Sequence, residues 1–313
     1  MSAFEECIQH AEQLGDGREV AVGKGSLGNV LLEQRRSPEA LAAYEEARER
    51  FSQLREPGSV AIYWHQTGIT YHEMGDQEAA EEAYRKALSI FVQTNDASGQ
   101  ARTPVQMGGL YDDLLDRPEE AVALYRQAAD KYIQIDYMAD EGRAWNNLGE
   151  TLHRLQRLDE ARQVIHRAIE CYAPYGHSVQ PWTAWSVLTN IETDAGNPDA
   201  AAEARQQAVT AYLAYRRDGG ENYDIEGRVA LDVTQALLTG EAAAIGGELQ
   251  QVADDPETPD WLQPFIQALQ AIVAGSRDRR LAEAPEFDLG MAAEILLLIE
   301  TLEKVEQGDH PSR

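Results

Sequence analysis

Alanine and glycine residues recur along the chain at a nearly constant interval. The alanines are separated by 40, 41, 40 and 40 residues and comprise Ala47, Ala87, Ala128, Ala168 and Ala208. Four glycines keep the same interval ahead of them, namely Gly28, Gly68, Gly108 and Gly149. A repeat of this length is one supersecondary unit that stacks on its neighbours to bury its apolar face. The pattern therefore predicts an elongated array whose function lies on a long shared surface.

Within each unit, small residues surround one aromatic residue. Gly68 is followed by Ala80, Tyr84 and Ala87, and corresponding residues follow Gly28 and Gly108. Small residues let two antiparallel helices approach closely, and a tyrosine fills the space between neighbouring hairpins. We therefore expect five helical hairpins, near residues 20–56, 60–96, 99–137, 140–176 and 180–217.

Residues that favour helix ends mark the turns between these helices. Gly75 ends a helix predicted near residues 60–74, and Asp76 is placed to cap the next helix. The 41-residue unit has its additional residue in the turn between Gly108 and Ala128. Two prolines stand at first helical positions, each after a residue expected to cap its helix, in the pairs Ser37-Pro38 and Asn197-Pro198.

The pattern resembles the tetratricopeptide repeat, whose signature has tryptophan, leucine, glycine and tyrosine on the first helix and alanine, an aromatic residue and alanine on the second. Two units match it well, through Trp64, Gly68, Tyr71, Ala80, Tyr84 and Ala87, and through Trp145, Leu148, Gly149, Leu152, Ala161, Ile165 and Ala168. HEAT-type repeats fit the period but lack this code of glycine and alanine. The resemblance covers about residues 21–217. It implies an all-α, right-handed α-solenoid in which a tryptophan at the position of Trp64, Trp145 and Trp185 belongs to the core.

The array is expected to begin in the middle of a unit. Phe4 to Cys7 lie 40 residues before Tyr44 to Ala47 and resemble them, so residues 2–14 are predicted to be the second helix of a half repeat. Natural arrays usually open with a capping unit. We therefore expect the chain to be a fragment of a longer protein.

The other end of the array loses the repeat pattern. Thr189, Glu192 and Arg205 replace the glycine and two aromatic residues of the fifth unit. The array is expected to span residues 1–217, followed by a divergent helical cap over 218–307 and a disordered tail over 308–313. Within the cap, apolar patterning predicts helices near 225–239, 241–253, 259–274 and 288–305.

The composition narrows the classes of partner. The chain of 313 residues has 54 acidic and 27 basic residues, a net charge of −27, which repels phosphate backbones and anionic membranes. No run of 18 apolar residues could span a bilayer, and the acidic start does not resemble a secretion signal. We therefore expect a soluble, cytoplasmic protein that binds neither nucleic acid nor membrane. Cys7 and Cys171 are expected to be reduced core thiols.

Motifs that carry enzyme chemistry are weak or out of place. Gly23 to Gly28 satisfies G-x-G-x-x-G, but Gly28 is the repeat glycine in mid-helix, whereas a phosphate-binding loop follows a strand. The nearest candidate metal ligands are His72 with Glu73 and His153 with Glu150, without H-E-x-x-H or paired Cys-x-x-Cys spacing. A G-x-S-x-G nucleophile elbow is also missing. We expect no enzyme, no metal and no cofactor.

Candidate binding residues are those that the repeat does not need for packing. In the tetratricopeptide repeat family these lie on the concave side of the first helices. The register assigns to this surface Asn29, Glu33, His65, Ile69, His72, Glu73, Arg102, Asp112, Asp113, Arg143, Asn146, Glu150, His153, Arg154, Ser186, Asn190 and Asp194. The surface is acidic around Glu73 and basic around Arg143, so a peptide or protein of complementary charge order is the expected partner.

Family resemblance indicates which ligands and roles to consider. The chaperone-binding subfamily holds an acidic C-terminus with lysines, arginines and asparagines, but here only Asn29 and Asn190 fall at comparable positions and the lysines are missing. The 40-residue units resemble the sensor arrays attached to STAND-type signalling NTPases, which implies a ligand-sensing or scaffolding region. A free-standing adaptor or co-chaperone that joins two proteins is the alternative.

Overall fold

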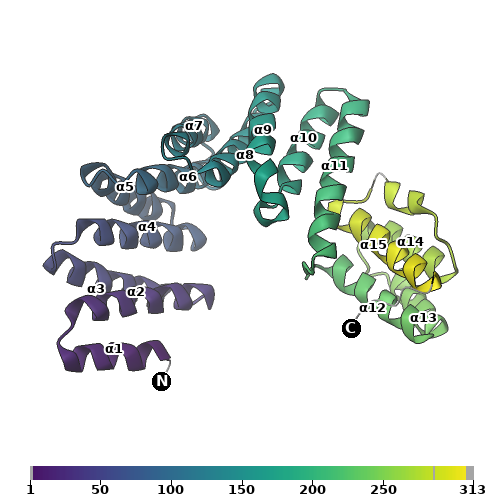
Figure 1. The fold of residues 1–313 in the computed structure, drawn as a ribbon, viewed down its shortest axis with the longest axis horizontal. Coiled ribbons are helices and arrows are strands. Elements are labelled where there is room, and N and C mark those ends of the chain that lie inside the picture. Colours follow the sequence, from purple (N-terminus) through teal and green to yellow (C-terminus); the bar gives the residue numbers. More distant parts are fainter. Residues whose placement is uncertain (1–2, 285, 308–313) are drawn as a thin grey trace. The chain divides into compact units, whose positions relative to one another are not determined.

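The protein is entirely helical in the part that the computed structural model describes, residues 3–284 and 286–307. The helices form two compact units, residues 1–172 and 173–313 (Figure 1). The boundary expected after residue 217 therefore lies inside the second unit. The expected tail, residues 308–313, lies outside the described residues. None of the described helices is long and apolar enough to cross a membrane.

Nine helices in succession make up the described part of the first unit. Each of α2 to α8 has 17 residues, and each hairpin packs on the next. Two such helices and their short connections account for the 40-residue period. The helices are α1 (Ala3–Leu14), α2 (Gly17–Glu33), α3 (Ser37–Gln53), α4 (Pro57–Glu73), α5 (Gln77–Gln93), α6 (Ala97–Asp113), α7 (Pro118–Gln134), α8 (Met138–Arg154) and α9 (Leu158–Tyr172).

A left-handed residue ends most helices of the first unit. At the end of α4, the amide of Asp76 donates to the carbonyl of Tyr71 and that of Gly75 to His72, both at 2.9 Å, as in a Schellman motif. Glycine supplies the left-handed conformation only at Gly15 and Gly75 in this unit; other residues adopt it at Arg35, Arg55, Asn95, Asp116, Asp136 and Gln156. The left-handed turn geometry thus recurs, although glycine at the left-handed position does not.

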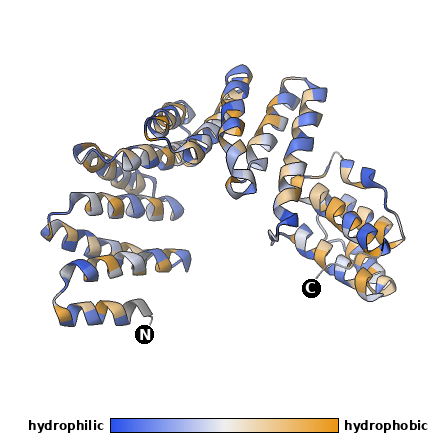
Figure 2. Ribbon diagram, in the orientation of Figure 1, coloured by the Kyte–Doolittle hydropathy of each residue, from blue (hydrophilic) through white to orange (hydrophobic). Residues whose placement is uncertain are grey.

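The repeat glycines admit the tyrosines of the second helices. A Cβ atom on Gly68 would lie 2.5 Å from Cδ1 of the fully buried Tyr84, which no real contact tolerates. Gly28 and Tyr44 are in the same relation. These glycines are therefore required because each tyrosine ring occupies the space of the missing side chain. Figure 2 shows polar and apolar residues alternating along the helices, as expected when one side of each is buried.

The second unit contains one more helical hairpin and a helical bundle. Its core gathers apolar residues from the last four α-helices of the chain, including Val233, Leu249, Phe265 and Ile299. Its α-helices are α10 (Trp182–Asp194), α11 (Pro198–Arg217), α12 (Ile225–Thr239), α13 (Ala242–Asp254), α14 (Gln263–Val273) and α15 (Leu289–Glu306), with short 3₁₀ helices at Ala173–Val179, Asp260–Leu262 and Arg279–Glu283. The four helices predicted after residue 218 correspond to α12 to α15.

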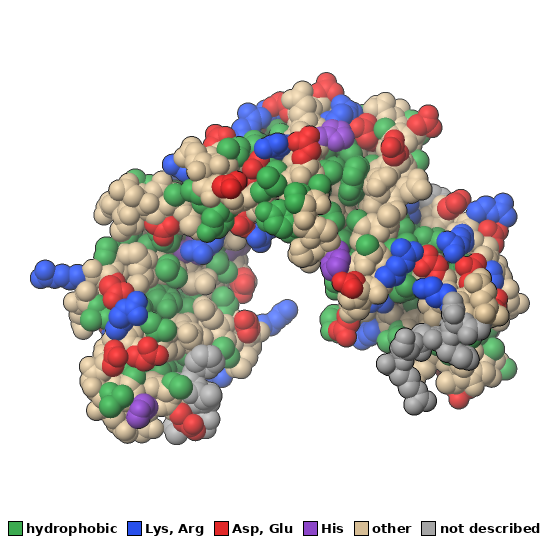
Figure 3. All heavy atoms as spheres, viewed as in Figure 1, with side chains coloured by type: hydrophobic (Ala, Val, Ile, Leu, Met, Phe, Trp, Pro, Cys, Tyr) green, Lys and Arg blue, Asp and Glu red, His purple; other side chains and the backbone are tan. Residues whose placement is uncertain are grey.

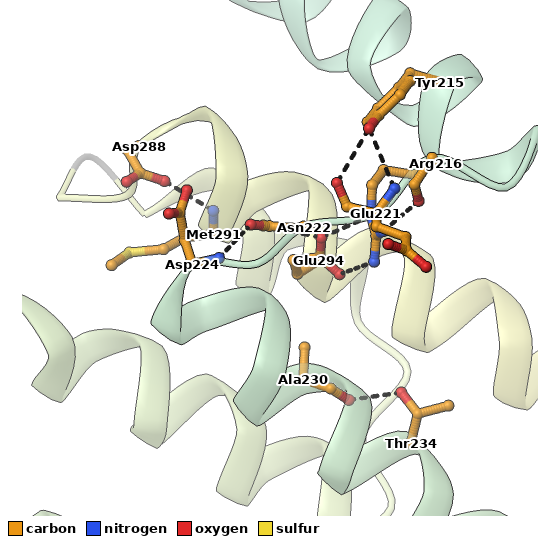
Figure 4. Close-up of polar contacts among 11 residues, drawn as sticks. Tyr215, Arg216, Glu221, Asn222, Asp224, Ala230, Thr234, Asp288, Met291 and Glu294 are labelled. Carbon is orange, nitrogen blue, oxygen red and sulfur yellow. Dashed lines mark hydrogen bonds and ion pairs between the residues drawn. The ribbon is translucent and has the colours of Figure 1, made fainter. Parts of the chain in front are cut away.

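A buried ion pair joins α11 to α15 inside the second unit (Figure 4). Arg216 Nε lies 2.8 Å from Glu294 Oε1, and the side chains are 13% and 3% exposed. Asn222 Nδ2 donates to the same oxygen of Glu294 at 3.2 Å. Arg205 also donates to the carbonyl of Phe287 at 2.8 Å. The last helix of the expected array is therefore held to the bundle, which explains why the unit boundary comes earlier in the chain.

Three local predictions need correction. Ser37 is the first residue of α3 and does not cap it, because Arg36 occupies the N-cap position. Cys7 is exposed, contrary to the prediction, whereas α1 buries Ile8 and Ala11. Cys171 is buried as expected, and burial raises the pKa of its thiol to about 12. The repeat tryptophans are half-buried rather than fully enclosed, although Trp64 and Trp145 pack against clusters of buried core residues as predicted.

Candidate functional site

The exposed surface of α2, α4, α6 and α8, here called the first-helix face, contains the candidate residues of the first unit except His65. Asn29, Glu33, Glu73, Asp113 and Glu150 are exposed on it. Figure 3 shows charged side chains of both signs on the face of the molecule in view. Ser186, Asn190 and Asp194 lie on α10, in the second unit.

Three carboxylates on this face occupy equivalent positions 40 residues apart. Glu33, Glu73 and Asp113 are the last residues of α2, α4 and α6. A negative charge at a helix C-terminus opposes the helix dipole, an effect of about 0.3–1 kcal/mol for an exposed group at low ionic strength. Within the described residues none of the three has an ion-pair partner. The fold itself therefore gives no reason for acidic residues at these positions.

The buried hydroxyls of Tyr44 and Tyr84 differ in their hydrogen bonding. Tyr44 donates to Asn29 Oδ1 at 2.8 Å, but the equivalent residue beside Tyr84 is Ile69, and the buried hydroxyl of Tyr84 has no hydrogen-bond partner in the described structure. Burial raises the pKa of Tyr84, and the charge of Glu73 raises it further.

A small recess occurs at Gly109 of α6. A Cβ atom built there would lie 3.8 Å from Cε1 of His72, 3.8 Å from the hydroxyl of Tyr125 and 3.9 Å from Oδ2 of Asp113. Side chains from α4, α6 and α7 therefore converge on this point. Their distances leave room for a methyl group in ordinary van der Waals contact, so this glycine is not required for packing.

Other charges on the first-helix face are neutralised within the fold. Arg154, which is equivalent to Asp113 one unit later, pairs with Asp112, and Asp112 also accepts a hydrogen bond from Thr151 at 2.7 Å. Arg143 pairs with Asp140 in the first turn of α8. The basic end expected around Arg143 is therefore largely compensated, whereas the acidic end is not.

The remaining candidates on α6 and α8 are dispersed. Arg102 is exposed on the N-terminal half of α6, and Asn146 has a buried side-chain oxygen without a hydrogen-bond partner in the described structure. His153 is half-buried and interacts with other residues of the chain. No group of three histidine, cysteine or carboxylate side chains among the described residues could hold a metal ion.

His65 is not part of the exposed face, contrary to the prediction. It is 3% exposed, its Nδ1 lies 3.1 Å from Thr103 Oγ1, and its ring is tilted against Tyr84. Burial, aided by the charge of Arg102, lowers its pKa to about 3. The side chain is a neutral core residue that joins α4 to α6.

We expect His65 to make the first unit sensitive to acid. The pKa of His65 in the folded protein lies below its value of about 6.5 in the unfolded chain. Its contribution to the free energy of unfolding is therefore fully present above about pH 6.5 and is lost as the pH falls toward 3. Linkage gives a loss of roughly 2 kcal/mol between pH 7 and pH 5. The variant His65→Asn keeps a hydrogen-bonding group near Thr103 but cannot take up this proton. In urea unfolding, its free energy of unfolding should therefore fall by that much less than that of the unmodified protein between the same two pH values. Equal losses in the two proteins would contradict the assignment.

Sequence reasoning missed a hollow on the second-helix side of the first unit. It encloses about 460 Å³ between α3 and α5, with Trp64 of α4 among its lining residues. Arg48 and Lys86 lie over the Trp64 ring, 3.7 and 4.3 Å from its centre. Arg48 donates to Thr67 at 2.9 Å and Lys86 pairs with Glu82 at 2.6 Å. Because its cations already have partners, this hollow is the weaker candidate site.

The glycine-rich stretch forms no phosphate-binding loop. Gly23, Gly25 and Gly28 all lie inside α2, and Tyr63 and Tyr44 pack against Gly25 and Gly28. These glycines serve helix packing, as expected from their place in the repeat.

Comparisons with known proteins agree with this architecture. A search of curated protein sequences returned no significant relative. Three solved structures have a similar fold. BtubC from P. vanneervenii has 18% identity and a TM-score of 0.62 over 69% of this chain and 93% of that chain. The apo form of RapI has 16% identity and a TM-score of 0.59 over 99% of this chain and 82% of that chain, and aspartyl phosphate phosphatase F from Bacillus subtilis has 16% identity and a TM-score of 0.58 over 97% and 76%.

Models of the tetratricopeptide repeat match two stretches of the sequence, residues 19–93 and 115–175. The matched stretches cover α2 to α5 and α7 to α9, where the buried alanines and tyrosines described above recur. The chain therefore contains tetratricopeptide repeats and folds as an all-α solenoid of antiparallel helical hairpins.

Proposed function

We propose that the chain is a binding module that holds a peptide or an extended segment of a protein on its first-helix face. The observation that carries this proposal is the row of exposed side chains at equivalent repeat positions, Glu33, Glu73 and Asp113, for which the described part of the chain shows no packing role and no ion pair. A partner that spans several units meets the same chemistry at a regular interval. Repeat arrays present extended surfaces of this kind.

The comparisons offer support at the level of the fold. A Rap protein complexed with competence and sporulation factor has a similar fold, with 16% identity over 93% of this chain and 75% of that chain and a TM-score of 0.53. A helical array of this type is thus compatible with ligand binding. The partner of the present chain must be inferred from its own surface.

A random peptide array probed with the full chain tests the proposal. We expect a subset of peptides to bind, and Ile69→Trp, which fills the centre of the first-helix face, to abolish their binding. Glu49→Trp adds the same side chain to an exposed position of α3 and should leave binding intact. Circular dichroism should confirm equal helicity in the three proteins. Binding that survives Ile69→Trp, or an array without bound peptides, would overturn the proposal.

For the cellular role we propose the ligand-sensing or scaffolding region of a larger signalling protein, of the kind in which a repeat array is attached to a STAND-type NTPase. The 40-residue units support this assignment through their resemblance to such arrays. The test is the reading frame of the gene: a segment with the P-loop pattern G-x-x-x-x-G-K-[ST] on the N-terminal side would support the role. A frame without such a segment would leave only the binding module.

A further inference from the structure

We propose that the recess at Gly109 is a subsite for a primary carboxamide, the side chain of an asparagine or glutamine residue in the bound segment. The carbonyl oxygen of this group accepts a hydrogen bond from the hydroxyl of Tyr125, and its amide nitrogen donates one to the carboxylate of Asp113. The inference rests on the proposed binding function and specifies the chemistry of the ligand at one position of the first-helix face.

The packing of the helices does not require a glycine at position 109. Glycine is one of the least favourable residues inside a helix, and its backbone here is not left-handed. A Cβ atom on Gly109 would meet its nearest neighbours at 3.8 Å, whereas one on Gly108 would lie 2.7 Å from the ring of Tyr125. Gly109 is also partly exposed. The missing side chain therefore leaves a space that a ligand can reach.

Three side chains surround this space. The Cβ position of Gly109 lies 3.8 Å from the hydroxyl oxygen of Tyr125 and 3.9 Å from Oδ2 of Asp113. Asp113 comes one turn later on α6, and helical side chains lean toward the N-terminus, so its carboxylate lies over the glycine. Cε1 of His72, on α4, lies 3.8 Å from the same point. Two groups that form hydrogen bonds thus face one small recess.

An equivalent position of the array shows which group fits there. Asn29 of α2 stands two repeat periods before Gly109 of α6. Its side-chain oxygen accepts a hydrogen bond at 2.8 Å from the hydroxyl of Tyr44, the residue equivalent to Tyr125. In α6 the chain supplies no side chain for this role. A carboxamide brought by a ligand restores there the hydrogen bond that Asn29 provides in α2.

The hydroxyl of Tyr125 is suited to donate into the recess. Burial raises the pKa of Tyr125 and nearby negative charges raise it further, whereas a hydrogen bond with Asn147 lowers it. A bond that favours the charged form of a phenol is donated to its oxygen. The proton of the hydroxyl therefore remains for an acceptor in the recess. The carboxylate of Asp113 can only accept, so the same ligand must also supply a donor.

A primary carboxamide has an acceptor and a donor at the same end of the group. A trans peptide directs its C=O and N–H to opposite sides, and ammonium and guanidinium groups have no acceptor. A hydroxyl combines both functions on one atom, but an atom at the Cβ position of Gly109 is beyond hydrogen-bond distance of both partners. The two atoms of a carboxamide can each approach one partner. Asparagine and glutamine are therefore the side chains that fit.

The probe is propionamide, titrated into the full chain while the amide resonance of Gly109 is followed by NMR. Controls of similar shape are propionate, propylammonium, 1-propanol and N-methylpropionamide. We expect a saturable shift of the Gly109 resonance with propionamide, at least about tenfold tighter than with any control, and little affected by salt because the probe is neutral. The absence of a saturable shift, or equal binding of any control, would overturn the carboxamide.

Gly109→Ala separates a binding role from a structural one, because its methyl group fills the recess without a clash. The melting temperature should rise while propionamide binding falls at least about tenfold. Gly58→Ala is the matched control, since it adds a methyl group to a glycine of α4 whose Cβ position has no described neighbour within 4 Å. This control should leave binding unchanged. Equal binding by Gly109→Ala and the unmodified protein would refute the subsite.

Two further variants each remove one hydrogen-bonding partner. Tyr125→Phe and Asp113→Ala should each weaken propionamide binding roughly 3- to 10-fold. Asp130→Ala removes a carboxylate from an exposed position of α7 and should leave the affinity unchanged. Unchanged affinity in Tyr125→Phe or Asp113→Ala would overturn the hydrogen bond assigned to that residue.

Peptides that bind in the array connect the subsite with the proposed function. Replacing the critical asparagine or glutamine of such a peptide by aspartate or glutamate should weaken binding at least about tenfold in the unmodified protein. The same replacement should have little effect in Gly109→Ala, where the recess is filled. Bound peptides that do not depend on asparagine or glutamine would leave the binding module intact and remove the carboxamide subsite.

Discussion

Arg216→Ala is expected to destabilise the second unit by about 3–5 kcal/mol, because it leaves the Glu294 carboxylate buried without its cation. Glu294 is 3% exposed, and among the described residues only the side chain of Asn222 would still donate a hydrogen bond to it, at 3.2 Å. A buried charge without compensation costs far more than a lost surface pair. Hydrogen exchange of the α15 amides measures the effect within the unit, without assuming that the whole chain unfolds in one step.

The neighbouring arginine is the control. Arg217 pairs with Glu300 at 2.7 Å, but its side chain is 46% exposed, so Arg217→Ala should cost no more than about 1 kcal/mol. Both variants remove one arginine from the last turn of α11. Similar protection of the α15 amides from hydrogen exchange in the two variants would show that burial does not make the Arg216 pair contribute more to stability than the exposed Arg217 pair.

Gly108→Ala and Gly109→Ala are expected to change stability in opposite directions. A Cβ atom on Gly108 would lie 2.7 Å from Cε1 of the buried Tyr125, so the tyrosine must shift at a cost of about 1–3 kcal/mol. The Cβ on Gly109 meets its nearest neighbours at 3.8 Å. There alanine improves helix propensity by up to about 1 kcal/mol.

Thermal melting of the two variants provides the comparison, since both positions lie inside α6 and the chemical change is the same. We expect the melting temperature to fall for Gly108→Ala and to rise for Gly109→Ala. A fall of equal size at both positions would mean that the glycines serve backbone flexibility rather than the space for Tyr125. The packing account of the repeat glycines would then be wrong.

The architecture of the array was predictable from the sequence because its signals are local and repeated. A glycine at one position admits a tyrosine from the next helix, and the same pair of residues occurs in several units. Gly75 and Asp76 form the predicted turn, with Asp76 Oδ1 accepting the amide of Ala79 at 3.2 Å. Each repeat restates the same information, so an error at one position is corrected by the others.

The site was predictable only in part. Repeat register placed Glu33, Glu73 and Asp113 on the exposed face, but it placed the buried His65 there as well. Positions 33 and 65 are both polar in sequence, and only packing distinguishes a helix end in solvent from a residue facing Thr103. Register also could not show that Asp112 neutralises Arg154, since these residues lie on different helices of successive hairpins.

The sequence by itself determined the helical hairpins, their 40-residue period and the tetratricopeptide code, because small and aromatic residues at fixed spacing specify how neighbouring helices pack. Tertiary structure alone decided which charges are free and which are compensated, because partners such as Arg216 and Glu294 are distant in the chain. It also decided that α11 packs against α15 of the bundle within the second unit. Packing patterns are written locally in a repeat protein, whereas charge compensation depends on which helices meet.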